Sequence, residues 1–144
     1  MAELLCALAI ISALSLCALL PVARSEADIV TEEAESLHDW LFEKMLEASH
    51  EGSSYKIDIT EPKKNRIELV LRHTDGPRYL ETENWRAENT WVRAVGTTKE
   101  MAFNGVWHTM SPAVTFMIRP DIGVSKILYV IISGAGRIRI SDKR

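Results

Sequence analysis

The spacing of apolar side chains changes twice along this chain of 144 residues. Residues 4–20 are uncharged and almost wholly apolar, and as a helix they would extend about 25 Å, at the short end of what crosses a bilayer. Beyond Pro21 the apolar residues recur every three or four positions, at Ala34, Leu37, Leu41, Met45 and Ala48, with Trp40 beside them. The pattern predicts a hydrophobic helix within residues 1–27 and an amphipathic helix over residues 31–51, ended by Gly52.

From Tyr55 onward the period shortens to two, which is typical of half-buried strands. About eight short runs within residues 55–141 are separated by turn-forming segments such as EPKKN, DGP and GTTKE. Faces of alternating apolar residues are expected at Ile67-Leu69-Leu71, Met101-Phe103-Trp107, Val114-Phe116-Ile118 and Ile138-Ile140. The run ILYVII is apolar at every position and is expected to form a central strand. The predicted fold is α+β, with the helix packed on an antiparallel β-sandwich or closed sheet in residues 28–144.

Charge is distributed unevenly, with a net −7 over residues 28–52 and +5 over residues 53–144. The acidic helix and the basic remainder either neutralise each other in part or form ordinary solvated faces. Both cysteines, Cys6 and Cys17, lie in the first apolar segment, which excludes a disulfide within residues 28–144.

The apolar start of the chain has three interpretations. A secretory signal peptide would be cut after Ala27, because the small residues Ser25 and Ala27 form a suitable cleavage site. Such peptides begin with positive charge, however, and here the first charged residue is Glu3. A simple membrane anchor would place Arg24 in the cytoplasm. The third interpretation is an assembly helix in which Glu3 has a specific role.

The third interpretation rests on a family resemblance. The opening ELLCALAII, with a proline near the end of the apolar segment, resembles the start of type IV pilins and pseudopilins. The ending VTFMIRPDIG followed by KILYVIISGAGRIRI resembles the C-terminal strands of minor pseudopilins of the FimT/GspH type. The passage LHDWLFEKMLEASHEGSSYKIDI fits the family's helix-to-strand transition, whereas residues 60–110 show no matching motif.

The resemblance implies a structural subunit of a type II secretion pseudopilus or a type IV pilus. Glu3 would match the family's register-setting glutamate, which pairs with a neighbouring subunit's amino terminus, if the chain begins two residues late. The family's basic leader and peptidase site are absent, and Pro21 lies within a residue of the family's helix-breaking proline. Expected partners are other pilins or pseudopilins through the N-terminal helix, the inner membrane that this helix spans once, and a secreted substrate or DNA at the periplasmic head.

The basic tail suggests one binding site. Arg137, Arg139, Lys143 and Arg144 lie close together, and a terminal strand would place both Arg137 and Arg139 on one face about 7 Å apart, near the spacing of backbone phosphates. Some FimT-like minor pilins hold DNA with such a tail, so the resemblance implies a candidate phosphate-binding edge. The alternative is that these charges only protect an exposed sheet edge from aggregation.

Other candidate chemistry is weaker, and we expect no enzyme, metal or cofactor. His73 and Asp75 are two possible metal ligands without a third, and Asp75 reads as part of a turn. Glu81 and Glu83 share a strand face but are expected to be solvated. Three tryptophans, Trp85, Trp91 and Trp107, are expected in the core rather than in a ligand pocket.

Three functions follow: an assembly subunit, a DNA-binding minor pilin of the same build, and an exported up-and-down β-barrel that binds an apolar ligand.

Overall fold

A long helix begins the described part of the molecule. The computed structural model describes residues 25–63, 66–123 and 126–144, so the predictions for Glu3 and Pro21 lie outside the described residues. Helix α2 (Glu26–Glu51) begins earlier than the expected residue 31, because Ser25 caps it. The Ser25 hydroxyl accepts a hydrogen bond from the Asp28 amide, and the Asp28 carboxylate accepts one from the Ser25 amide. Gly52 ends the helix in the left-handed conformation, as predicted.

The predicted apolar stripe of α2 is confirmed as its buried face. Ala34, Leu37, Leu41 and Ala48 have no exposed surface, and Met45 is 8% exposed. Trp40 packs partly buried against the same core. Within the described residues, no helix combines the length and apolar character needed to cross a membrane.

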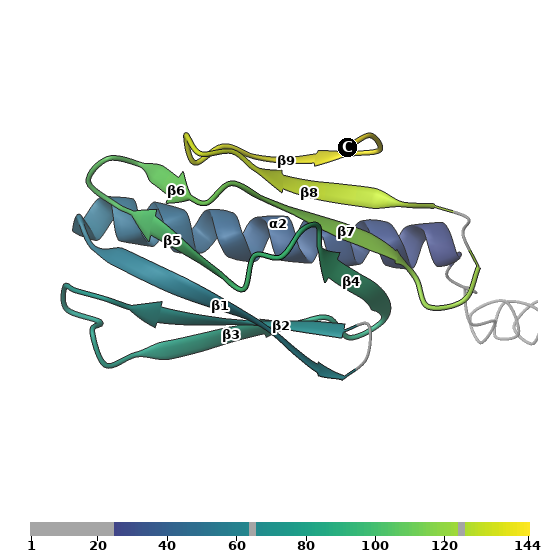
Figure 1. The fold of residues 1–144 in the computed structure, drawn as a ribbon, viewed down its shortest axis with the longest axis horizontal. Helices are drawn as coiled ribbons and strands as arrows, with labels where there is room; N and C mark the ends of the chain where they lie inside the picture. Colours follow the sequence, from purple (N-terminus) through teal and green to yellow (C-terminus); the bar gives the residue numbers. More distant parts are fainter. Residues whose placement is uncertain (1–24, 64–65, 124–125) are drawn as a thin grey trace, which may run out of the picture.

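The strands form two separate antiparallel sheets, confirming the predicted α+β fold (Figure 1). The five-stranded sheet has the order β3-β2-β1-β5-β6, and the four-stranded sheet has the order β4-β7-β8-β9. In chain order the strands are β1 (Ser54–Lys63), β2 (Arg66–His73), β3 (Thr82–Arg86), β4 (Thr90–Ala94), β5 (Glu100–Asn104), β6 (Thr109–Ser111), β7 (Val114–Pro120), β8 (Leu128–Ile132) and β9 (Ile138–Ser141). In Figure 1 β1, β2 and β3 lie below α2, β8 and β9 lie above it, and β7 crosses in front.

Most predicted strand faces are buried on the helix side. The residues Ile67, Leu69, Leu71, Val114, Phe116 and Ile118 are all at most 3% exposed. The ILYVII run forms β8, which lies between β7 and β9 as expected for a central strand, although Tyr129 and Ile131 on its outer face are only half-buried.

Two expectations about the strands were wrong. The run MAFNGVWH is not one strand: β5 ends at Asn104 and a turn follows, which leaves Trp107 75% exposed. The Asn104 side chain accepts hydrogen bonds from the amides of Val106 and Trp107 and so stabilises the turn. The up-and-down barrel of the exported-module hypothesis is also not the fold, because the two sheets are open and separate.

Candidate functional site

The basic tail lies on the edge of the four-stranded sheet, next to the core of the head. Ile138 and Ile140 of β9 pack against the core, whereas Arg137 and Arg139 are exposed, as the alternation predicted. The two arginines line one hollow of about 290 Å³ together with Ile131 and Ser133. Lys143 and Arg144 are exposed, but Arg144 lines a different hollow, beside Arg93 and Tyr129.

Strand pairing extends this positive charge across the outer face of the sheet. The sequences of β4, β7, β8 and β9 contain no aspartate or glutamate. Their outward positions include Arg93, Arg119 and Arg139, and with Arg137 these residues form what we call the basic face. Arg119 lies over the Trp91 ring, 4.2 Å from its centroid, which holds the guanidinium against the sheet.

The sequence interpretation did not include Arg93 among the basic residues of this face, although the alternation around Val92 indicates its outward position. In Trp91-Val92-Arg93 the buried Val92 requires its neighbours to point outward, and Trp91 remains only 8% exposed because Arg119 covers it. Trp85 is likewise 8% exposed and packs in the core cluster, so the expectation of core tryptophans is confirmed for Trp85. It is wrong for Trp107, which is exposed, and Trp91 is buried on the outer face of its sheet rather than in the core cluster.

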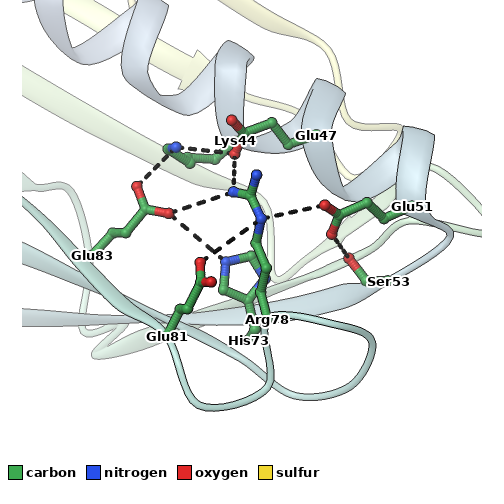
Figure 2. A network of polar contacts seen from close by, with 8 residues as sticks. All are labelled: Lys44, Glu47, Glu51, Ser53, His73, Arg78, Glu81 and Glu83. Carbon is green, nitrogen blue, oxygen red and sulfur yellow. Dashed lines mark hydrogen bonds and ion pairs between the residues drawn. The ribbon is translucent and has the colours of Figure 1, made fainter.

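A second charged cluster joins α2 to the β2–β3 loop (Figure 2). The Arg78 guanidinium lies 2.9 Å from the Glu47 carboxylate and 3.3 Å from that of Glu51. Lys44, a helix residue that is only 7% exposed, contacts Glu47 at 3.0 Å and Glu83 at 2.8 Å. The acidic helix is therefore partly neutralised by Arg78, one of the two possibilities left open by the charge distribution.

The pKa values within this charged cluster reflect the competition between burial and pairing. Burial lowers the pKa of Lys44, but hydrogen bonds to Glu83 and Glu47 outweigh it and raise the pKa above its ordinary value. Burial raises the pKa of Glu47, but the hydrogen bond from Lys44 and the charges of Lys44 and Arg78 outweigh it and lower the pKa. Lys44, Glu47 and Arg78 are thus charged at neutral pH, and the Arg78–Glu47 contact holds the loop to the helix.

His73 is brought to Glu81 and Glu83 rather than to Asp75. The Asp75 carboxylate instead accepts a hydrogen bond from the Ser54 amide, as expected for a turn residue. The His73 side chain is 1% exposed, and its Nε2 lies 4.0 Å from Glu83 Oε1. Neither ring nitrogen hydrogen bonds to any of the described residues. From the sequence, His73 with Asp75 and Glu81 with Glu83 were separate candidates, and only the β2–β3 pairing unites His73 with the second pair.

A third polar contact holds the β3–β4 loop, which joins the two sheets, against α2. Glu33, 8% exposed on α2, accepts hydrogen bonds from the amides of Glu88 at 3.0 Å and Asn89 at 3.1 Å. One turn away, the Trp85 indole donates to the Ser36 hydroxyl at 3.1 Å. Side chains of α2 and β3 line a hollow of about 630 Å³ here. No local sequence pattern indicates Glu33, because its partners are backbone groups far along the chain.

One serine–histidine contact resembles a catalytic pair but has the wrong proton arrangement. Ser49 Oγ lies 2.9 Å from His108 Nδ1 and 2.7 Å from the Met45 carbonyl oxygen. A hydroxyl has one hydrogen to donate, and a carbonyl can only accept, so Ser49 donates to Met45 and accepts from His108. The imidazole therefore cannot take the hydroxyl proton as a general base in this arrangement.

Comparisons with known proteins identify solved structures of similar fold. No family model matches the chain, and no curated protein does. A crystal structure of the Pseudomonas aeruginosa type IV minor pilin FimU matches with a TM-score of 0.58 and 20% identity, covering 80% of this chain and 90% of that one. A second crystal form of the same pilin matches with a TM-score of 0.59 and 19% identity, covering 79% and 94%. The chain therefore has a type IV pilin-like fold.

Proposed function

We propose that the chain is a minor pilin or minor pseudopilin, a structural subunit that acts in the assembly or at the tip of a type IV pilus or type II secretion pseudopilus. The observation that carries this proposal is the pilin-like fold at the C-terminal side of an apolar segment of membrane length. The residues proposed for assembly are Glu3, for register, and Pro21, for a break before α2. The proposed location is the bacterial inner membrane, with the head in the periplasm.

The capped start of α2 supports this proposal over a cleaved signal peptide. A cut after Ala27 would fall inside α2 and remove Ser25, the residue that caps the helix. Loss of such a cap typically costs about 1 kcal/mol. The head is therefore better preserved when residues 1–27 remain attached.

The N-terminal residue and intact mass of the protein, extracted from its native membrane, test this proposal. We expect a chain that retains the apolar segment and has a methylated amino terminus two residues ahead of Met1. Replacement of Glu3 by Ala should abolish recovery in the sheared filament fraction and leave thermal unfolding of the head unchanged. Glu35→Ala, at an exposed position of α2, is the matched control. A soluble chain that begins at Asp28 would refute the proposal.

A second candidate function, DNA binding by the same subunit, is favoured by the basic face. Arginines from β4, β7 and β9 share a surface whose strands carry no acid, and this arrangement suits a phosphate backbone. Retention of the protein on DNA as salt concentration rises tests it. Arg137→Ala with Arg139→Ala should weaken binding and reduce the slope of log K against log salt by roughly 0.9 per lost contact. Lys99→Ala, at an exposed position outside the basic face, should change neither. No retention at low salt would exclude this function.

A further inference from the structure

We propose that His73, Glu81 and Glu83 form a binding site for a divalent transition-metal ion of the zinc type. One imidazole nitrogen and one oxygen from each carboxylate all lie within 4.8 Å of one another. His73 comes from the end of β2, Glu83 from β3 and Glu81 from the loop before it, so the fold itself brings the three together (Figure 2). Imidazole and carboxylate are both ligands that Zn²⁺ prefers.

The buried imidazole of His73 indicates a ligand-binding site and not merely a cluster of acidic side chains. His73 is 4% exposed and no described residue hydrogen bonds to either of its ring nitrogens, although buried polar groups normally have partners. Its Nε2 faces Glu83 Oε1, which is the carboxylate oxygen that Lys44 does not bind, since Lys44 contacts Oε2. A metal ion between Nε2 and Oε1 would satisfy the imidazole without breaking the buried Lys44 contact.

The charge of the cluster also favours a cation. Four carboxylates, from Glu47, Glu51, Glu81 and Glu83, meet two positive side chains, from Lys44 and Arg78. These side chains carry a net formal charge of −2, which a divalent ion balances. Four carboxylates share only two cations and repel one another, so binding the ion stabilises this end of the head.

Arg78 competes for the site but can give way. Its contacts with Glu81 and Glu83 are both 3.8 Å, whereas those with Glu47 and Glu51 are 2.9 and 3.3 Å. The metal would therefore replace the two longer ion pairs and leave the two shorter ones in place. Two ligands at about 2.1 Å on a tetrahedral ion are about 3.4 Å apart, so His73 Nε2 and Glu83 Oε1, now 4.0 Å apart, must approach by about 0.6 Å, and the other ligand pairs by at most about 1.4 Å. The Glu81 side chain is 58% exposed and is free to make this movement.

Zinc titration of the full chain in mild detergent, after removal of metal with a chelator, tests the site by calorimetry. We expect one Zn²⁺ per chain, which excess Mg²⁺ does not displace because Mg²⁺ suits carboxylate and water rather than imidazole. Glu81→Gln and Glu83→Gln should each weaken binding about ten-fold or more. Glu100→Gln and His50→Gln, at exposed positions elsewhere, should not change it.

Two further measurements separate the site from incidental binding. Because His73→Gln alters a buried position and can disturb folding, the decisive ligand variant is Glu81→Gln, whose fold is checked by circular dichroism. Arg78→Gln should bind Zn²⁺ about five-fold more tightly, since it removes a positive charge that lies 3.8 Å from both ligand carboxylates. Zinc binding that is unchanged in Glu81→Gln and Glu83→Gln, or weaker in a folded Arg78→Gln protein, would overturn the proposal, as would no binding by the unaltered chain.

Discussion

The Glu33 carboxylate is predicted to be a main attachment between α2 and the loop that joins the two sheets. It is 8% exposed and accepts two backbone hydrogen bonds, from Glu88 and Asn89. A hydrogen bond to a charged group contributes roughly 1.5–3 kcal/mol. Removing both would cost about 3–6 kcal/mol, but water can reach the exposed loop residues, and alanine favours the helix by a few tenths of a kcal/mol. We therefore expect Glu33→Ala to lower the free energy of unfolding by about 2–4 kcal/mol.

The assay is urea unfolding of the full chain in mild detergent, followed by tryptophan fluorescence, which reports on the buried Trp85 and Trp91. Glu33→Gln keeps one acceptor oxygen and should lose about half as much stability as Glu33→Ala. Glu35→Ala, at an exposed position of the same helix turn, is the control and should stay within about 0.5 kcal/mol of the unaltered chain. Hydrogen exchange adds a local readout, because the amides of Glu88 and Asn89 should lose protection in Glu33→Ala. Equal stability of Glu33→Ala and Glu35→Ala, with those amides still protected, would refute the reasoning.

Two further predictions concern close packing and pH. Gly105→Ala should destabilise the head by about 3 kcal/mol or more, because a Cβ there would overlap the carbonyl oxygens of Ser53 and Ala48. Thermal unfolding measures this against Gly134→Ala, where a Cβ has room, and equal melting temperatures would contradict it. The second prediction concerns Glu47, whose pKa in the folded state is lower than its ordinary value of 4.5. Its ionised form therefore stabilises the fold above pH 4.5, and this contribution is lost as the pH falls through the lower pKa of the folded state. The difference in melting temperature between the unaltered chain and Glu47→Gln should therefore shrink between pH 7 and pH 3, and a constant difference would show that the Glu47 charge contributes nothing.

The sequence by itself determined most of the elements and the faces they bury. A helix places every third or fourth side chain on one face, and a strand places every second one there. Spacing alone therefore predicted the Ala34–Ala48 stripe of the helix and the inward sides of β2, β7 and β9. The helix end at Gly52 followed from local backbone preference. The exposed pair Arg137 and Arg139 followed from the same alternation. The place of ILYVII between two other strands followed instead from its apolar residues at every position.

Only the tertiary structure decided which distant residues meet. Trp107 was misassigned because Asn104 ends β5 through hydrogen bonds that apolar periodicity does not report. Glu33 and Arg78 gained their roles from partners in other elements, and local spacing holds no information about those contacts. His73 met Glu83 because antiparallel pairing sets β2 against β3 in a particular register. Spacing describes one element at a time, whereas a site made by several elements depends on how the sheets and helix pack together.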